Sequence, residues 1–180
     1  MPRTFTVSDS VVIAASPTAV YGRISRPALM GRWSPENLGA TVRTRDGGRG
    51  GGRGGAPDTY VGMVFDGHNR RGRMRWTTRC TVTAADADER FAFRVHAIGI
   101  RTPRQRGPIA GWEYRLEAVD GGTRVTETWT DDRRSWPDAV AHLFDRVATS
   151  RHTFADFQAR NIHRTPSNLK RVTEGPPAAD

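Results

Sequence analysis

Glu127 is the side chain of this sequence best placed to do chemistry. It alternates with Val125 and Trp129 in a segment that reads as a strand, so all three are predicted to face inward. A carboxylate in an apolar interior is costly unless it is paired or protonated. Burial would move the pKa of Glu127 toward the range useful for acid–base catalysis. Two alternatives stay open: a structural ion pair with an inward arginine, and a bulge that turns Glu127 outward.

Asn69 is the second catalytic candidate. It shares its parity with Phe65 and Gly67 at the end of an earlier predicted strand, so it faces inward if Phe65 does. Its amide could then donate a hydrogen bond to a ligand carbonyl or enolate oxygen. The alternative is an ordinary turn residue before Arg70 and Arg71.

Large aromatic side chains at inward positions are the natural lining of a small-molecule site. They could instead fill a solid core, but we expect at least two of the four inward tryptophans to line a pocket. Glu36 could contact a polar group of the ligand or belong to an ordinary turn. The candidate ligand-binding residues are Trp33, Glu36, Phe65, Trp76, Phe93, Trp112, Tyr114, Trp129 and Phe154.

The elements that must position these residues follow one another in a regular order. Alternation predicts a strand over 5–13, and Ser16 with Pro17 then caps a helix that carries an apolar stripe. A second short helical turn follows, and then about six strands with turn residues between them. A long helix is predicted from Pro137 to about Asn161.

Two segments are predicted to lack regular structure. Residues 46–57 are rich in Gly and Arg, and we interpret them as a flexible hairpin loop rather than as an RNA-binding repeat. Residues 164–180 are predicted to be a disordered tail. The domain is therefore expected to span 1–163.

Composition limits the classes of function. The net charge of +9 comes almost entirely from arginines spread along the chain, which disfavours a nucleic-acid role. There is no transmembrane or secretory pattern, so a cytoplasmic protein is expected. No His/Cys/Asp cluster has metal-ligand spacing and no phosphate-binding loop is present, so neither a metal nor a cofactor is predicted.

Five segments in this order resemble the SRPBCC superfamily, also called START-like or helix-grip proteins, and in particular its polyketide cyclase/dehydrase or lipid-transport type. They are Val12–Ser25, Trp33–Glu36, Phe65–Asn69, Trp76–Val82 and Thr123–Trp129. The resemblance implies an α+β helix-grip fold, in which a curved antiparallel sheet of about seven strands wraps a long C-terminal helix, with two short helices after the first strand. It also implies a cavity for an apolar molecule.

Two functional hypotheses follow from the resemblance. In the first, the chain binds a polyketide- or lipid-like molecule, and Glu127 moves a proton while Asn69 holds an enol oxygen, as in a cyclase or dehydratase. In the second, the chain is a non-enzymatic carrier or ligand-responsive module that contacts an acidic partner, such as a carrier protein, a membrane surface or RNA. The sequence does not decide between an enzyme and a binder, and it leaves the oligomeric state open.

Overall fold

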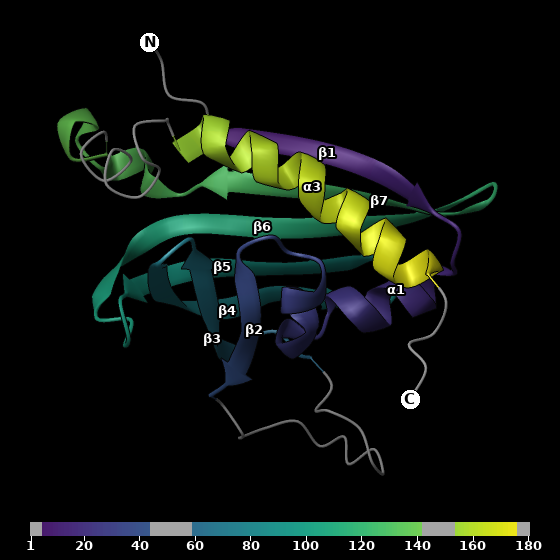
Figure 1. Ribbon diagram of the computed structural model, residues 1–180, viewed down its shortest axis with the longest axis horizontal. Helices are drawn as coiled ribbons and strands as arrows, with labels where there is room; N and C mark the ends of the chain where they lie inside the picture. The colour runs from purple at the N-terminus through teal and green to yellow at the C-terminus, as the bar shows by residue number, and fades with distance from the viewer. Residues whose placement is uncertain (1–4, 44–58, 142–153, 176–180) are drawn as a thin grey trace.

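One antiparallel sheet of seven strands forms the body of the molecule (Figure 1). The computed structural model describes residues 5–43, 59–141 and 154–175, and gives only the backbone of 154–160. The strand order is β1-β7-β6-β5-β4-β3-β2. The strands are β1 (Thr6–Ile13), β2 (Asn37–Val42), β3 (Val64–Arg71), β4 (Met74–Asp86), β5 (Arg90–Gly99), β6 (Gln105–Val119) and β7 (Gly122–Asp131). The predicted curved sheet with a C-terminal helix is confirmed.

The two short helices predicted after the first strand are α1 (Pro17–Ile24) and the 3-10 helix η1 (Pro27–Arg32). Ser16 caps α1, and its hydroxyl accepts a hydrogen bond from the Ala19 amide at 3.3 Å. Val20 and Ile24 lie on the buried face of α1 and are fully buried. A second 3-10 helix, η2 (Arg133–Ser135), follows β7.

The sheet curves so that its inner face can be closed by the last helix. The pairing register shifts between β2 and β3, at two places between β4 and β5, and once between β5 and β6, and such irregularities bend a sheet. Helix α3 (Phe154–Glu174) lies across β1 and β7 and also contacts η1 (Figure 1). Helix α3 therefore covers the inner face on the side of β1 and β7 rather than over the middle strands.

The hairpin that joins β6 to β7 sets the register of the two strands that matter most for the site. Gly121 and Gly122 have φ values of +85° and +143°, which favour glycine. A Cβ atom on Gly122 would lie 2.0 Å from the Ile13 carbonyl oxygen. The glycines of the Asp120-Gly121-Gly122 turn are thus required by close packing, and the turn places Tyr114 directly opposite Glu127.

The end of the chain departs from the prediction. Helix α3 continues to Glu174, so the predicted domain end at 163 and the predicted disorder over 164–174 are wrong. Ile162 and Leu169 are buried on one face of the helix, and its last turn is tied to the sheet. There the Glu174 carboxylate accepts hydrogen bonds from the Ala14 amide at 2.6 Å and from Lys170 at 2.7 Å.

Pro166 explains why this part of the helix was missed. Proline removes one helical hydrogen bond and usually ends a helix. Here the Thr165 hydroxyl bonds the Asn161 carbonyl, and the Ser167 hydroxyl bonds the His163 carbonyl, each at 3.0 Å. The helix therefore continues through Pro166, with a side-chain hydrogen bond to a backbone carbonyl from the residue on either side of the proline.

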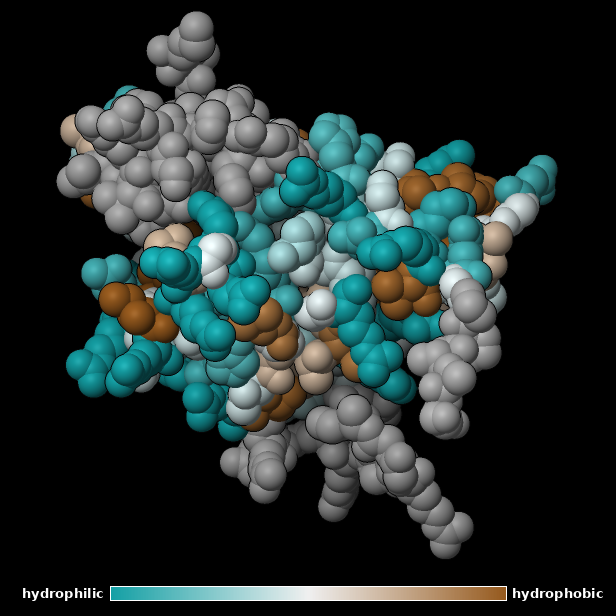
Figure 2. All heavy atoms as spheres, in the orientation of Figure 1, coloured by the Kyte–Doolittle hydropathy of each residue, from teal (hydrophilic) through white to brown (hydrophobic). Residues whose placement is uncertain are grey.

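Several predicted segments lie outside the described residues: the Gly/Arg loop at 46–57, most of the predicted helix before Phe154, and 176–180. Within the described part, no helix is both long and apolar enough to cross a membrane. On the face shown in Figure 2, hydrophilic side chains predominate and hydrophobic ones form small separate groups.

Candidate functional site

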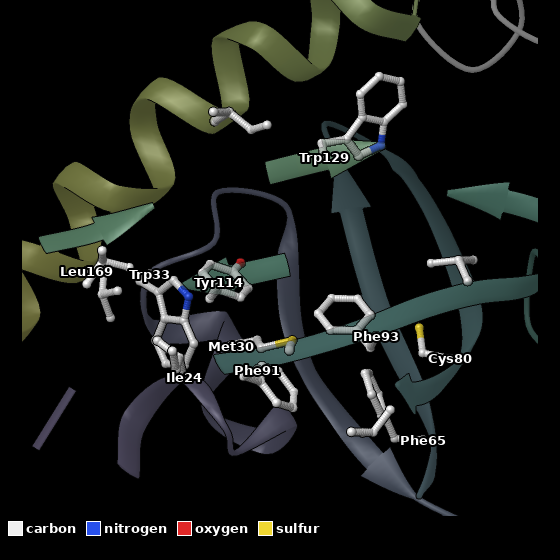
Figure 3. Close-up of a cluster of buried hydrophobic side chains, with 14 of the residues drawn as sticks. Ile24, Met30, Trp33, Phe65, Cys80, Phe91, Phe93, Tyr114, Trp129 and Leu169 are labelled. Atoms are coloured by element: carbon white, nitrogen blue, oxygen red, sulfur yellow. The ribbon is translucent and has the colours of Figure 1, made fainter. Parts of the chain in front are cut away.

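A cavity of about 630 Å³ lies between the inner face of the sheet and α3. Most of its wall comes from β3 to β7, with Met30 of η1 and Ile162 of α3 closing it. The deep part is apolar, and Figure 3 shows Phe65, Cys80 and Phe93 gathered there from three neighbouring strands. Such a volume and lining are typical of a site for a small molecule.

Aromatic rings give this wall a definite shape. Phe93 and Trp112 stack with ring centroids 5.7 Å apart and an interplanar angle of 10°. Phe65 meets Phe93 edge-on at 5.4 Å. Because these rings hold one another, a flat or extended apolar ligand meets a preformed surface.

Glu127 lies in this wall beside Tyr114. The Tyr114 hydroxyl donates a hydrogen bond of 2.8 Å to Glu127 Oε1, and Oε2 has no hydrogen-bond partner among the described residues. Glu127 is 2% exposed and Tyr114 5%. The predicted inward direction of Glu127 is therefore found, and neither an outward bulge nor an ion pair to an inward arginine is seen among the described residues.

Burial raises the pKa of the Glu127 carboxyl to about 8. The hydrogen bond from Tyr114 lowers that pKa, and the charge of Asp9 raises it. Asp9 lies opposite Glu127 on β1 and pairs with His163 of α3 at 2.8 Å. Burial also raises the pKa of Tyr114 well above its ordinary value, with Glu127 adding to the effect. At neutral pH Glu127 is thus a neutral acid that holds a proton.

Asp66 differs from Glu127 in that it has cationic partners. It too is a buried carboxyl, but its oxygens accept hydrogen bonds from Arg79 and Arg43, each at 2.8 Å. Burial opposes ionisation of Asp66, yet the two arginines outweigh it and lower the pKa. A structural role accounts for Asp66, whereas no cation compensates Glu127 in the described residues.

Asn69 belongs to a polar group on the opposite wall. Its Oδ1 accepts from Asn37 Nδ2 at 3.4 Å, and its Nδ2 donates to the Gly67 carbonyl at 3.2 Å and to the Thr78 hydroxyl at 3.4 Å. In the sheet order, β3 is four strands from β7, which corresponds to about 19 Å along the sheet. Asn69 and Glu127 line one cavity but are not neighbours.

The mouth of the cavity is basic. Arg71 is fixed there, because its guanidinium bonds Glu36 at 2.5 and 3.2 Å and lies 5.6 Å from the ring centroid of Trp76. Arg73 and Arg75 also line the mouth. These three arginines lie in or beside the two-residue turn between β3 and β4, where Gly72 takes a φ of +55°.

Most of the predicted site residues reach the cavity wall. They are Glu36, Phe65, Asn69, Trp76, Phe93, Trp112, Tyr114 and Glu127. Trp33 and Trp129 do not line it; they are 2% and 0% exposed and belong to the core. Trp33 ends η1 under α3, where Asn168 bonds its carbonyl at 3.0 Å, and Trp129 lies on β7, which α3 covers. The side chain of Phe154 lies outside the described residues.

Sequence reasoning missed the contributions of the mouth and of α3. Arg75 precedes the cavity-lining Trp76 and so has outward parity on its strand, but at the end of a hairpin a long side chain can reach round the edge. The available signal was the dense cluster from Arg70 to Arg75. The polar wall residue Thr165 was placed in the tail. Among the described residues, no three His, Cys, Asp or Glu side chains come together to hold a metal ion.

Comparison with known proteins agrees with this geometry. The family model described as polyketide cyclase / dehydrase and lipid transport matches residues 4–174. The chain belongs to this family. The resemblance drawn from the five sequence segments is thereby confirmed. No curated protein matches the chain closely enough to indicate a relationship.

Solved structures share the fold of this family member. The Zhui aromatase/cyclase from Streptomyces sp. R1128 is similar with a TM-score of 0.65 at 14% identity, covering 94% of this chain and 93% of that one. The di-domain aromatase/cyclase StfQ of the steffimycin biosynthetic pathway has a TM-score of 0.65 at 11% identity, covering 94% of this chain and 50% of that one. A polyketide-cyclase-like protein from Corynebacterium glutamicum has a TM-score of 0.55 at 24% identity, covering 97% and 92%. At these identities the likeness concerns the fold.

Proposed function

We propose that the chain binds an apolar small molecule, polyketide- or lipid-like, in the cavity, and that Glu127 acts on it as a general acid. The observation that carries the proposal is a carboxyl that lies in an aromatic cavity wall with its pKa raised to about 8. A group that keeps its proton at neutral pH can give it to a ligand oxygen. The family and the aromatase/cyclase neighbours support this class of ligand and chemistry.

The proton balance suits cyclisation or dehydration. Glu127 would protonate a carbonyl oxygen during ring closure, or a hydroxyl that then leaves as water. In ring closure an enol carbon of the ligand bonds to the carbonyl carbon, and the enol hydroxyl gives its proton to the resulting carboxylate. In dehydration that carboxylate takes a proton from the adjacent carbon as the double bond forms, so that neither step consumes a proton overall. Tyr114 would steady the carboxylate in between, because its hydroxyl already donates to Oε1.

Asn69 has a different place in this scheme. Because it lies on the far wall, it would bind a ligand oxygen remote from the one that Glu127 protonates. Its amide already bonds Gly67 and Thr78 at 3.2 and 3.4 Å, and such long hydrogen bonds are readily exchanged for a shorter one. Asn69 would therefore orient the ligand, whereas Glu127 would do the chemistry.

A carrier without chemistry is the second candidate. It is favoured by the shielding of Glu127 Oε2, which is buried even though the residue lies in the cavity wall. A ligand would have to shift neighbouring side chains to reach that oxygen. The acidic partner expected for a carrier was inferred partly from the 46–57 loop, which lies outside the described residues.

Binding is tested with the apolar fluorophore phenylnaphthylamine. Wild-type protein should bind it, and Ile98→Trp, which adds bulk to a half-buried position in the cavity wall, should lose most of that binding. Val12→Trp is the matched control, because Val12 is 38% exposed and lies outside the wall. Equal binding by both variants would contradict a ligand site in the cavity.

Chemistry is tested with whatever apolar molecule co-purifies, identified by native mass spectrometry. Wild type and Glu127→Gln are compared for conversion of that molecule. The proposal expects binding by both proteins and conversion by wild type alone. Conversion at the wild-type rate by Glu127→Gln would remove the catalytic role and leave the binding role.

A further inference from the structure

The mouth of the cavity holds more positive charge than the described residues neutralise. Among the residues that the structure describes, five acidic or arginine side chains line the cavity: Glu36, Arg71, Arg73, Arg75 and Glu127. Glu36 neutralises Arg71 through two hydrogen bonds. Glu127 is uncharged below about pH 8. Two guanidinium groups are therefore left without a carboxylate partner in the described part of the chain.

Those two groups are Arg73 and Arg75. Neither makes a side-chain hydrogen bond, ion pair or ring contact with any described residue, whereas Arg71 makes all three. Arg75 lies opposite Arg70 in the register of the hairpin. Its cross-strand neighbour therefore adds positive charge and does not neutralise it. Two guanidinium groups that line one cavity and have no carboxylate partner among the described residues form a site for an anion, because each presents several donors in a fixed fork.

The rim around these arginines is apolar rather than uniformly polar. Met74 lies between them and is 44% exposed, and Ile100 on the facing loop is 81% exposed; both line the cavity. A fully polar ligand would gain nothing from these side chains, and a fully apolar one would leave the arginines unused. The combination fits a molecule whose apolar body continues to the mouth and ends in an anion.

We propose that the ligand is an amphipathic acid, with its apolar part in the cavity and a carboxylate, sulfonate or phosphate bound by Arg73 and Arg75 at the mouth. This rests on the proposed binding function and adds the chemical class and the orientation of the ligand. The anionic end points outward, so the opposite, uncharged part of the molecule lies toward Glu127.

Two fluorophores with the same ring skeleton test the inference. Anilinonaphthalene sulfonate carries an anionic group, and phenylnaphthylamine lacks it. Wild type should bind the sulfonate about tenfold more tightly, the equivalent of one charge-assisted hydrogen bond. In Arg73→Gln/Arg75→Gln this advantage should disappear, while the affinity for the neutral probe stays the same. The advantage should also shrink as salt is added.

Arg70→Gln is the matched control, because Arg70 lies in the same hairpin and carries the same charge but does not line the cavity. It should keep the preference for the sulfonate. Equal wild-type affinity for the two probes would overturn the inference, and so would a loss in Arg70→Gln as large as in the double variant. An equal loss of both probes in the double variant would also overturn it, since the arginines would then only shape the pocket.

The same titrations separate this inference from the function it rests on. If wild type fails to bind even the neutral probe, the proposed ligand cavity fails, and the anion site fails with it. If the neutral probe binds and the sulfonate has no advantage, only the anion site fails. Displacement of the neutral probe by dodecanoate or by dodecyl phosphate then distinguishes a carboxylate from a phosphate as the preferred group, and displacement by dodecanol equal to both would contradict an anion site.

Discussion

The raised pKa of Glu127 has a consequence for stability that can be measured without knowing the ligand. The folded protein keeps this proton up to about pH 8, whereas the ordinary value for a glutamate is 4.5. Between these values the folded state binds more protons than the unfolded chain, so the free energy of unfolding falls as the pH rises. The contribution is fully present below pH 4.5 and fully lost above about pH 8.

Its size follows from the same two values. A change in pKa from 4.5 to about 8 corresponds to about 5 kcal/mol in total, since each pKa unit is worth roughly 1.4 kcal/mol. Glu127→Gln is uncharged at every pH and lacks this loss. The stability of the variant relative to wild type should therefore rise by about 1.4 kcal/mol per pH unit across the window and be constant on either side.

Urea unfolding of both proteins, at pH values inside and outside the window, measures this difference. Groups that titrate in both proteins cancel in the comparison. Glu113→Gln on β6 is the control: burial opposes its ionisation, but hydrogen bonds from Arg90 and Arg115 outweigh this and lower its pKa. Its own window lies below 4.5, so it should show no slope above that pH. Parallel stability curves for wild type and Glu127→Gln would refute the reasoning and remove the basis for a general acid.

Three further changes probe the same network and one neighbouring ion pair. Tyr114→Phe removes the donor to Glu127 and should move the upper end of the pH window, where the slope of stability against pH ends, above pH 8, at a cost of about 1 kcal/mol or more below that pH; the same urea series measures both. Asp9→Asn removes a charge that raises the pKa of Glu127, so the upper end of the window should move below pH 8. Asp131→Asn breaks a buried pair, in which Arg133 bonds Asp131 at 2.7 and 2.9 Å, and should cost about 3 kcal/mol or more in thermal or urea unfolding; a change within about 0.5 kcal/mol would contradict burial of that pair.

Sequence alternation was sufficient to find the inward wall of the site. Strands have a strict two-residue period, so Val125 and Glu127 on β7 and Phe65 and Asn69 on β3 could be assigned to one face each. The same rule failed at strand ends. Arg75 has outward parity and still lines the mouth, because its side chain is long and the hairpin ends there.

The partner of Glu127 could not be found in this way. Tyr114 and Glu127 meet only because β6 and β7 pair in one register, and a shift of one residue would have placed another side chain opposite. The predictions that Trp33 and Trp129 line the cavity failed for a related reason: a side chain that faces inward can belong to a cavity wall or to the core. That depends on which part of the sheet α3 covers, and α3 extends farther than the polar composition after Thr165 suggested.

The separation of charges within the cavity bears on how a ligand would be oriented. A neutral acid lies on β7, and the uncompensated arginines lie at the turn between β3 and β4, four strands away in the sheet order. An anion beside Glu127 would be buried in an apolar wall with no cation beside it among the described residues, whereas an anion at Arg73 and Arg75 is attracted. The two ends therefore favour one orientation of an amphipathic acid over its reverse. In that orientation the atoms offered to Glu127 belong to the uncharged part of the molecule, where a carbonyl or hydroxyl oxygen can accept the proton.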